Sequence, residues 1–377
     1  MLRQLDYLCL QPTREGQASY AHVNEIVAGL RRRGWEVRLI EVPHPRPGST
    51  SGIRRAIAAA ATQIRYWARC RLRPARFVYF RDHFAALPTA ALARAAGAIV
   101  VYECNGPIED AYDAWPQLRM LHRLLSVSMR IQVRWADAVI AVTPGLLGYV
   151  ADLTGRRSGL YVVGNGADVD RFRPATARGG TSRRPYVVFV GALASWQGID
   201  TALCAVEAPA WPPDVDLVIA GDGKERGRIQ VAARTNQHIH WLGTIPYSES
   251  ANLVSESLAA LVPMTDGPRA RFGLSPLKLF EAMACGVPVV ASDLPGLREV
   301  VRAHGCGITF APGDADALAR AVAELVEDPT RATEMGSRGR AAAEALYSWD
   351  IRASQTEQIL LSAAGRVRPA VKSQHVV

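Results

Sequence analysis

Short apolar runs alternate with longer helical patterns from one end of this 377-residue chain to the other. The runs are almost continuous in valine, isoleucine, leucine and alanine, which is typical of parallel strands that are covered on both faces. Helical patterns such as residues 20–34, which end at Gly34, and 315–328, which end before Pro329, separate the runs. This alternation predicts an α/β protein with doubly wound sheets.

The predicted strands form two series with a break between them. The first series is residues 5–10, 37–42, 77–80, 99–103, 138–142 and 161–163, and the second is residues 186–190, 217–220, 240–242, 259–262, 287–291 and 307–310. Residues 173–185 are polar and rich in glycine and proline, which is typical of a linker. We therefore expect two α/β domains that face each other across a cleft, with ligands at the carboxyl ends of their strands.

These patterns set the expected domain limits. We expect a first domain over residues 1–172, the linker over 173–185, a second domain over 186–346, a closing helix over 347–365 and a disordered tail over 366–377. No apolar run is long enough to cross a bilayer, and the first residues lack a signal-peptide pattern. A cytoplasmic protein is the expectation that follows.

The six cysteines lie far apart and form no CxxC pair. That spacing argues against a zinc site and a disulfide framework, and most of these side chains are expected to be buried. No carboxylate cluster has metal-ligand spacing either, so we expect no bound metal and no cofactor.

Positive charge is concentrated in the first half of the chain. Residues 1–170 hold 22 arginines, no lysine and 14 acidic residues, which is +8 of the total charge of +9. The arginines cluster in residues 54–76 and recur at Arg119, Arg123, Arg130 and Arg134. Basic segments with apolar faces attract anionic lipid headgroups, although a solvated helix face would look the same. Nucleic-acid binding is not expected, because aromatic residues are not interleaved with the arginines.

One segment, residues 275–293, combines a helix start with a charged pair. Ser275 before Pro276 predicts a serine N-cap and a helix over residues 276–285. Lys278 in its first turn suits an anion at the helix N-terminus, and Glu281 could accept hydrogen bonds from a vicinal diol. An anion site plus a diol acceptor indicates a nucleoside diphosphate. The alternative is a solvent-exposed pair of the two side chains.

The same segment, SPLKLFEAMACGVPVVASD, resembles the signature of glycosyltransferase family 4, a retaining family with the GT-B fold. Further stretches resemble family elements in the same order: VYECNGPIED, VVGNGADVDRFRP, VVFVGALASWQGID, LVIAGDGKER and YSWDIRA. The resemblance implies two Rossmann-like domains facing across a cleft, with the helix at 347–365 crossing back to the first domain.

The resemblance also assigns roles to residues. Glu281 matches the glutamate that binds the ribose, and Lys278 with the backbone amides of residues 274–277 should face the diphosphate. Gly16 matches a loop that approaches the donor from the first domain, or else is a simple tight turn. The full expected donor-binding set is Glu281, Ser275, Leu274, Leu277, Gly273, Arg271, Gly16, Gly191, Gln197 and Gly221.

Three positions depart from the family pattern. Gly273 replaces the first glutamate of the usual pair, and Ala192 and Gln197 replace an arginine and a lysine. Lys278, with Arg269 or Arg271, could supply the missing charge.

In the first domain, Asn105 stands where the family usually has a histidine. Together with Lys278, Asn105 and Glu103 are the expected catalytic residues. Contacts to the acceptor are expected from Glu109, Arg81 and His83, although a lone histidine is more often structural.

The expected reaction is transfer of a sugar from a nucleoside-diphosphate sugar to a glycan, lipid-linked or small-molecule acceptor, with retention, in cell-surface polysaccharide assembly. The leaving diphosphate can itself take the acceptor proton, so the enzyme must supply mainly positive charge and a dry site. Two alternatives are a sugar-nucleotide epimerase of the same fold and a catalytically silent nucleotide-binding partner of another transferase. The basic first domain leaves open contact with the inner membrane face.

Overall fold

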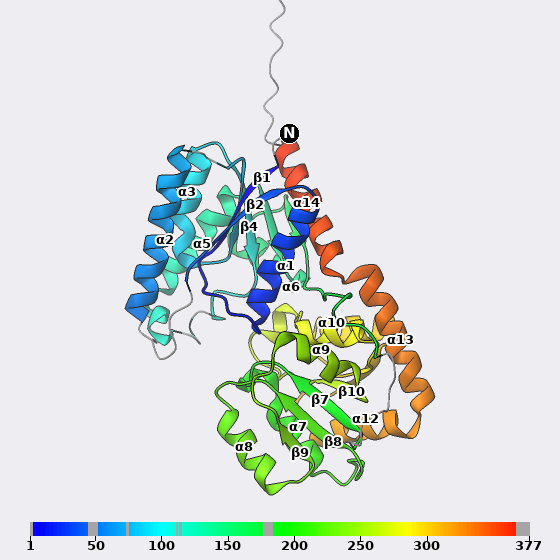
Figure 1. The fold of residues 1–377 in the computed structure, drawn as a ribbon. Coiled ribbons are helices and arrows are strands. Elements are labelled where there is room, and N and C mark those ends of the chain that lie inside the picture. Colours follow the sequence, from blue (N-terminus) through cyan, green and yellow to red (C-terminus); the bar gives the residue numbers. More distant parts are fainter. Residues whose placement is uncertain are drawn as a thin grey trace, which may run out of the picture. The chain divides into compact units, whose positions relative to one another are not determined.

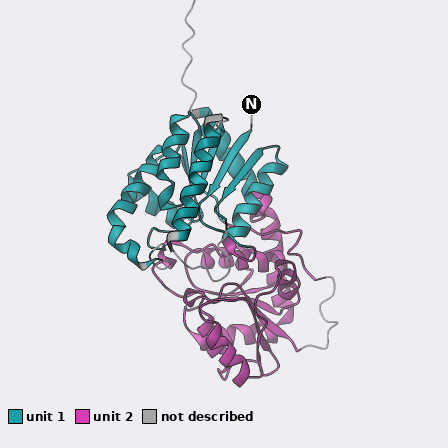
Figure 2. Ribbon diagram, turned by 60° about the vertical axis from the view of Figure 1, so that its left-hand side comes forward, with its two compact units in different colours: residues 1–14, 19–164, 352–377 teal, residues 15–18, 165–351 magenta. Residues whose placement is uncertain are grey.

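A computed structural model describes residues 3–43, 52–72, 75–110, 112, 115–175 and 184–366 of the chain (Figure 1). The chain forms two compact units (Figure 2). Unit 1 comprises residues 1–14, 19–164 and 352–377, and unit 2 comprises residues 15–18 and 165–351. The domain limits drawn from the sequence stay a prediction. Residues 176–183 of the expected linker and 367–377 of the expected tail lie outside the described residues.

Unit 1 contains a parallel sheet with the strand order β2-β1-β3-β4-β5-β6. Its strands are β1 (Gln4–Cys9), β2 (Glu36–Glu41), β3 (Phe77–Arg81), β4 (Ile99–Cys104), β5 (Ala138–Ala141) and β6 (Leu160–Val162). The chain reverses its direction along the sheet between β1 and β3. Large aromatic side chains of the central strands fill the core, among them Tyr7, Tyr79, Phe80 and Tyr102.

Helices cover both faces of this sheet. They are α1 (Ala18–Arg32), α2 (Gly52–Leu72), α3 (Leu87–Ala95), α5 (His122–Trp135), α6 (Pro144–Thr154) and the part of α14 (Trp349–Arg366) from Arg352 onward, with the short 3₁₀ helices η1 (Phe84–Ala86) and η2 (Pro116–Leu121). Neighbouring helices α2, α3, α5 and α6 pack against one another in that order (Figure 1). Right-handed crossovers put α1 on the opposite face, because its connection runs the other way along the sheet.

Unit 2 contains a second parallel sheet, with the order β12-β11-β10-β7-β8-β9. Its strands are β7 (Tyr186–Val190), β8 (Asp216–Ala220), β9 (Ile239–Trp241), β10 (Ala259–Val262), β11 (Val289–Ser292) and β12 (Gly307–Phe310). This is the strand order of a dinucleotide-binding fold, and the direction of winding reverses between β7 and β10. Ligands of such sheets bind outside the carboxyl ends of the strands at the reversal.

Alternate residues of the unit 2 strands face two separate cores. On β7, Val187 and Phe189 pack into one core, while Tyr186 and Val188 pack into the other. The helices are α7 (Ile199–Val206), α8 (Arg226–Thr235), α9 (Tyr247–Ser255), α10 (Leu277–Ala284), α11 (Leu297–His304), α12 (Ala315–Glu327) and α13 (Pro329–Leu346), with the 3₁₀ helices η3 (Ser195–Gln197) and η4 (Ala270–Phe272). Burial on both faces explains why the strands are almost continuously apolar.

The α/β architecture with two doubly wound parallel sheets is confirmed. Each strand predicted from the sequence is present, with ends within two residues of the expected positions. All six cysteines are free thiols; five are buried, and Cys204 on α7 is exposed. In the part of the chain that the structure describes, no helix is both long and apolar enough to cross a membrane.

Candidate functional site

Two glycines bring neighbouring loops together at the reversal point of the unit 2 sheet. Gly191 follows β7 with φ 151°, and Gly221 follows β8 with φ 143°. A Cβ added at Gly221 would lie 1.9 Å from the Gly191 carbonyl oxygen, and one at Gly191 would lie 3.2 Å from Lys278 Nζ. A side chain at Gly221 would collide with the backbone, and the positive φ of Gly191 disfavours any residue with a side chain. As a result, the ammonium of Lys278 lies directly beside the end of β7.

Lys278, in the first turn of α10, has neutral close neighbours. Its Nζ donates a 2.7 Å hydrogen bond to Gln197 Oε1 and lies 3.7 Å from the centroid of the Phe189 ring. Next to Gln197, Gly198 packs closely against the segment at Pro263, because an added Cβ there would lie 1.4 Å from the Pro263 carbonyl oxygen. Burial lowers the pKa of Lys278 to about 7, and the charge of Glu281 reverses this only in part. An added anion would stabilise the charged form.

Glu281 lies almost one turn further along α10 and is 8% exposed. Its Oε1 accepts a 2.9 Å hydrogen bond from the Tyr247 hydroxyl. Burial raises the pKa of Glu281 to about 7, against the opposing effects of Tyr247, Lys278 and Arg171. Arg171 in turn lies 4.9 Å from the centroid of the Tyr247 ring. Neither Tyr247 nor Arg171 was predicted from the sequence, because no local motif marks them as partners of α10.

The alternative of a solvent-exposed Lys278–Glu281 pair is wrong. Glu281 is buried and bonded to Tyr247, while the ammonium of Lys278 is bonded to Gln197. Both charges have lost most of their water without gaining a full set of charged partners. A polar ligand that brings an anion and hydroxyl groups would supply what they lack.

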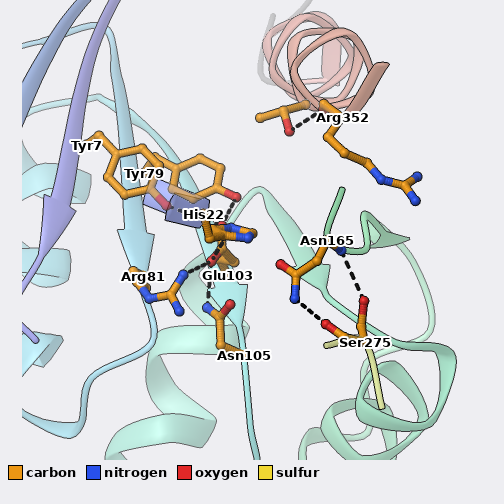
Figure 3. Close-up of polar contacts among 10 residues, drawn as sticks. Tyr7, His22, Tyr79, Arg81, Glu103, Asn105, Asn165, Ser275 and Arg352 are labelled. Atoms are coloured by element: carbon orange, nitrogen blue, oxygen red, sulfur yellow. Dashed lines mark hydrogen bonds and ion pairs between the residues drawn. The ribbon is translucent and has the colours of Figure 1, made fainter. Parts of the chain in front are cut away.

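Ser275 does not cap α10, contrary to the prediction. The helix begins at Leu277, and its N-cap is Pro276 with no side-chain cap. The Ser275 hydroxyl instead accepts a 3.2 Å hydrogen bond from the Asn165 amide, and its carbonyl oxygen accepts a 2.5 Å bond from Asn165 Nδ2 (Figure 3). Ser275 thus fixes the segment before α10 to the loop at Asn165, a residue that the sequence analysis did not single out.

The other residues near Ser275 are only partly placed as expected. The Leu274 amide donates to the Pro295 carbonyl oxygen at 2.8 Å, so it is not free for a diphosphate, contrary to the prediction. The Leu277 side chain is buried at 8% exposure. Arg271 is exposed, and its guanidinium lies 4.5 Å from the centroid of the Phe272 ring. The Leu279 amide donates to the Pro276 carbonyl oxygen at 3.2 Å, which leaves the amides of Leu277 and Lys278 at the start of α10. Anion binding by these amides and the Lys278 side chain stays a prediction.

In unit 1, Glu103 at the end of β4 is the centre of a buried polar cluster (Figure 3). Its carboxylate accepts hydrogen bonds from Tyr7 (3.4 Å), Tyr79, Arg81 (2.9 Å) and Asn105 (2.5 Å), and His22 Nε2 lies 3.0 Å away. Although burial raises the pKa of Glu103, contacts with His22, Arg81 and Tyr79 hold that pKa well below its usual range. With 1% exposure and so many donors, Glu103 is poorly suited to act as a base.

Arg81 and Asn105 lie at the carboxyl ends of the neighbouring strands β3 and β4, and both donate to Glu103. Arg81 is 8% exposed and engaged by Glu103, whereas Asn105 is half-buried and donates its side-chain amide to the same carboxylate. Glu109 is half-buried, and among the described residues its Oε2 has no hydrogen-bond partner. Glu109 therefore keeps one carboxylate oxygen that can accept a further hydrogen bond.

The ring of His83 contacts residues of its own segment. Its Nδ1 accepts a 3.2 Å hydrogen bond from the Ala85 amide, which caps η1, and its ring stacks on Phe84. Burial lowers the pKa of His83 to about 4, so the ring is neutral at pH 7. The neighbouring Asp82 was not singled out from the sequence, yet burial raises its pKa to about 6 while it accepts a 2.6 Å bond from the Tyr102 hydroxyl.

Gly16 has φ 87°, and an added Cβ would meet nothing within 4 Å. Backbone conformation alone thus favours glycine there. Its expected approach to a donor stays a prediction.

Comparison with known proteins places this geometry in a family. Residues 21–171 match the model described as Glycosyltransferase Family 4, and residues 175–342 match that described as Glycosyl transferases group 1. The chain is 30% identical over 281 residues to the GDP-mannose-dependent alpha-(1-6)-phosphatidylinositol monomannoside mannosyltransferase of Mycolicibacterium smegmatis, covering 71% of this chain and 72% of that enzyme. The chain belongs to glycosyltransferase family 4.

Two further comparisons describe the range of the similarity. A GDP-mannose-dependent monoacylated alpha-(1-6)-phosphatidylinositol monomannoside mannosyltransferase of Corynebacterium glutamicum is 31% identical over 210 residues, 52% of this chain and 55% of that enzyme. The match thus spans about half the length of that relative. The structure of Anabaena Alr3699/HepE in complex with UDP-glucose superposes with a TM-score of 0.70 at 18% identity, over 95% of this chain and 99% of that one. This likeness shows the GT-B fold of the family.

The structure gives physical reasons for two departures from the family 4 pattern. Gly273 has φ 79° and ψ 150°, a conformation that side chains rarely adopt, so a glutamate there would be strained. Gln197 accepts a hydrogen bond from Lys278, and a lysine in its place would set two ammonium groups against each other. The glutamine at 197 and the lysine at 278 are therefore matched to each other.

Proposed function

We propose that this family 4 protein is a retaining transferase that moves a hexosyl group from a nucleoside-diphosphate sugar to a glycan, lipid-linked or small-molecule acceptor. The observation that carries the proposal is the pairing, on one short helix, of a cation with neutral close contacts and a buried carboxylate held by one tyrosine. Lys278 lacks an anion, and Glu281 can still accept hydrogen bonds.

A nucleoside diphosphate meets both requirements at once. Its phosphates would bind Lys278 and the free amides at the start of α10, where the helix dipole favours negative charge. Its ribose hydroxyls would donate to the carboxylate of Glu281, in addition to the Tyr247 hydroxyl. Because residues 191 and 221 are glycines, no side chain of theirs blocks the end of β7, where the diphosphate would approach.

The chemistry follows from where charge develops. The acceptor oxygen forms a bond to the anomeric carbon while the bond to the diphosphate breaks, and the acceptor proton passes to the departing diphosphate oxygen on the same face. This route retains configuration and requires positive charge at the leaving group, which Lys278 supplies in surroundings where electrostatic effects are strong. We propose that the reaction needs no metal, which transfer in the presence of a chelator would test.

The names of the relatives support a choice of donor and acceptor classes. Two of them are named as GDP-mannose-dependent enzymes acting on phosphatidylinositol monomannosides, and the Anabaena protein was solved with UDP-glucose. We therefore propose a hexose donor on GDP or UDP and an acceptor carried by a lipid or a glycan, in cell-surface glycoconjugate assembly. A cytoplasmic location is part of the same proposal, and cell fractionation tests it.

The proposal is tested by a thermal-shift screen of UDP-, GDP-, ADP- and dTDP-sugars on the full chain, since ligands that bind the folded state raise its apparent stability. We expect one nucleotide to raise the melting temperature, and Glu281→Ala to abolish that rise. Transfer is then measured with that donor against lipid-linked and glycan acceptors. Failure of every nucleotide to bind would overturn the proposal.

A second candidate rests on the departures from the family pattern. With Gly273, Ala192 and Gln197 in place of charged residues, the chain could bind a nucleotide sugar without transferring it. Donor binding with neither hydrolysis nor transfer over many acceptors would favour this silent role. Conversion of the donor without any acceptor would instead indicate an epimerase.

A further inference from the structure

The outward face of η2 and α5 combines exposed apolar side chains with arginines. Exposed fractions are 90% for Met120, 63% for Leu124 and 48% for Val127, and Leu121 is 47% exposed. Arg119, Arg123, Arg130 and Arg134 are exposed on the same two elements. We call these eight residues the η2–α5 face.

Helical geometry separates this face into two adjacent stripes. Leu124 and Val127 are three residues apart and form one apolar stripe on α5, while Arg123, Arg130 and Arg134 line the next stripe round the helix. The opposite side of α5 packs into the core of unit 1, where Leu125, Met129 and Val133 are buried. The exposed apolar residues are thus additional to those that fold the protein, and water surrounds them at a cost.

The charge of the face is of one sign. Residues 115–135 contain four arginines and no aspartate or glutamate. Among the described residues, none of these four arginines forms an ion pair. A partner for this surface must therefore offer both negative charge and an apolar region that the exposed apolar side chains can enter.

Helix α2 repeats the combination in the same layer of helices. Its 21 residues contain no acidic residue, and Ile57 (62% exposed) and Ile64 (58% exposed) lie seven residues apart on one stripe. Exposed arginines at positions 54, 65 and 69 flank that stripe. Because α2 packs against α3 and α3 against α5, the pattern recurs on the same side of the unit 1 sheet.

We propose that the η2–α5 face docks unit 1 onto an anionic phospholipid bilayer. Headgroups would pair with the arginines, and Met120, Leu124 and Val127 would enter the boundary between headgroups and acyl chains. A second copy of this chain is a poorer occupant, because a two-fold interface would set the same four arginines against one another. The inference is independent of the transferase reaction, since it rests on unit 1 alone.

The test is sedimentation of the full chain with vesicles. We expect co-sedimentation with vesicles of equal parts phosphatidylglycerol and phosphatidylcholine, little with phosphatidylcholine alone, and weaker binding as salt increases. R123Q/R130Q/R134Q should lower the partition coefficient on anionic vesicles by about a hundredfold, at about fivefold per arginine. L124S/V127S should lower it about tenfold or more by removing apolar insertion.

Matched controls lie on unit 2. V231S removes an apolar side chain that is 60% exposed on α8, and R234Q/R320Q removes two exposed arginines. Both controls should sediment like the unaltered chain, and all variants should keep its circular dichroism spectrum and melting temperature. Equal binding by the face variants and the controls, or no binding to anionic vesicles, would overturn the proposal. So would concentration-dependent self-association without lipid that the face variants abolish, since that identifies a second copy as the occupant.

Discussion

Unit 1 and unit 2 each bury a glutamate beside a cation, and the pKa values of the two carboxyl groups are shifted in opposite directions. Glu103 is surrounded by donors, and its pKa is held well below its usual range despite burial. Glu281 has one tyrosine donor, and burial raises its pKa to about 7. A buried charge with all its partners is part of the folded framework, whereas one that lacks partners is prepared for a ligand. Four predictions test this contrast.

The largest effect is expected in unit 1. Glu103→Ala leaves Arg81 and His22 buried without their carboxylate, and should reduce the free energy of unfolding by about 3–5 kcal/mol. Urea denaturation measures the change. Glu281→Gln is the matched comparison in unit 2 and should leave stability unchanged or slightly higher, because it removes a poorly satisfied charge. Equal destabilisation by the two variants would contradict the contrast.

The second effect is on catalysis. Lys278→Ala should lower kcat by about 10²-fold or more, because the leaving diphosphate loses its cation. Its melting temperature should stay close to that of the unaltered chain, since the lost contacts are one amide and one aromatic ring. Lys224→Ala, at an exposed lysine, serves as the control in steady-state transfer assays. Near-normal turnover by Lys278→Ala would reject the assigned role.

The third effect is on the pH dependence of nucleotide binding. An adjacent diphosphate raises the pKa of Lys278 above its free value of about 7, so binding takes up a proton above pH 7 and affinity falls as pH rises. Ribose hydroxyls favour ionised Glu281, whose free pKa is also about 7, so affinity falls as pH drops below 7. Calorimetry should give a maximum near pH 7, with each limb approaching about tenfold per pH unit.

Two variants assign the limbs of that profile. Lys278→Arg should remove the alkaline limb, because arginine keeps its charge, and Glu281→Gln should remove the acid limb. A flat profile in the unaltered chain would show that neither group changes its protonation on binding.

The smallest effect concerns Tyr247, which is the one hydrogen-bond donor to Glu281 among the described residues. Tyr247→Phe removes the hydroxyl but keeps the ring that packs against Phe172, so stability should change little. The pKa of Glu281 should rise further, so less of it is ionised at pH 7 and nucleotide affinity there should fall, by about 1.4 kcal/mol per unit of pKa change at most. Calorimetry at pH 6 and 8 checks this, since the loss of affinity should be larger at pH 6 and smaller at pH 8.

The sequence predicted the strands well because burial on both faces leaves a continuous apolar signal. It also placed Lys278 and Glu281 on one short helix, as the structure does, while their donor-binding roles stay a prediction. What it missed depends on contacts between distant segments. Tyr247 reaches Glu281 from α9, Asn165 takes the hydroxyl that was expected to cap α10, and His22 joins Glu103 from α1. No local spacing encodes such contacts, and a proline at the N-cap was not foreseen.

The distribution of the thiols has a practical consequence. Burial raises the pKa of Cys9 and Cys306 to about 11 and of Cys285 to about 12, so these groups hold almost no reactive thiolate at neutral pH. Cys204 on α7 is the single exposed cysteine of the six. A maleimide dye or spin label should therefore attach to the native chain at one position, outside the residues of the candidate site. Spectroscopy of nucleotide binding needs no prior removal of other cysteines.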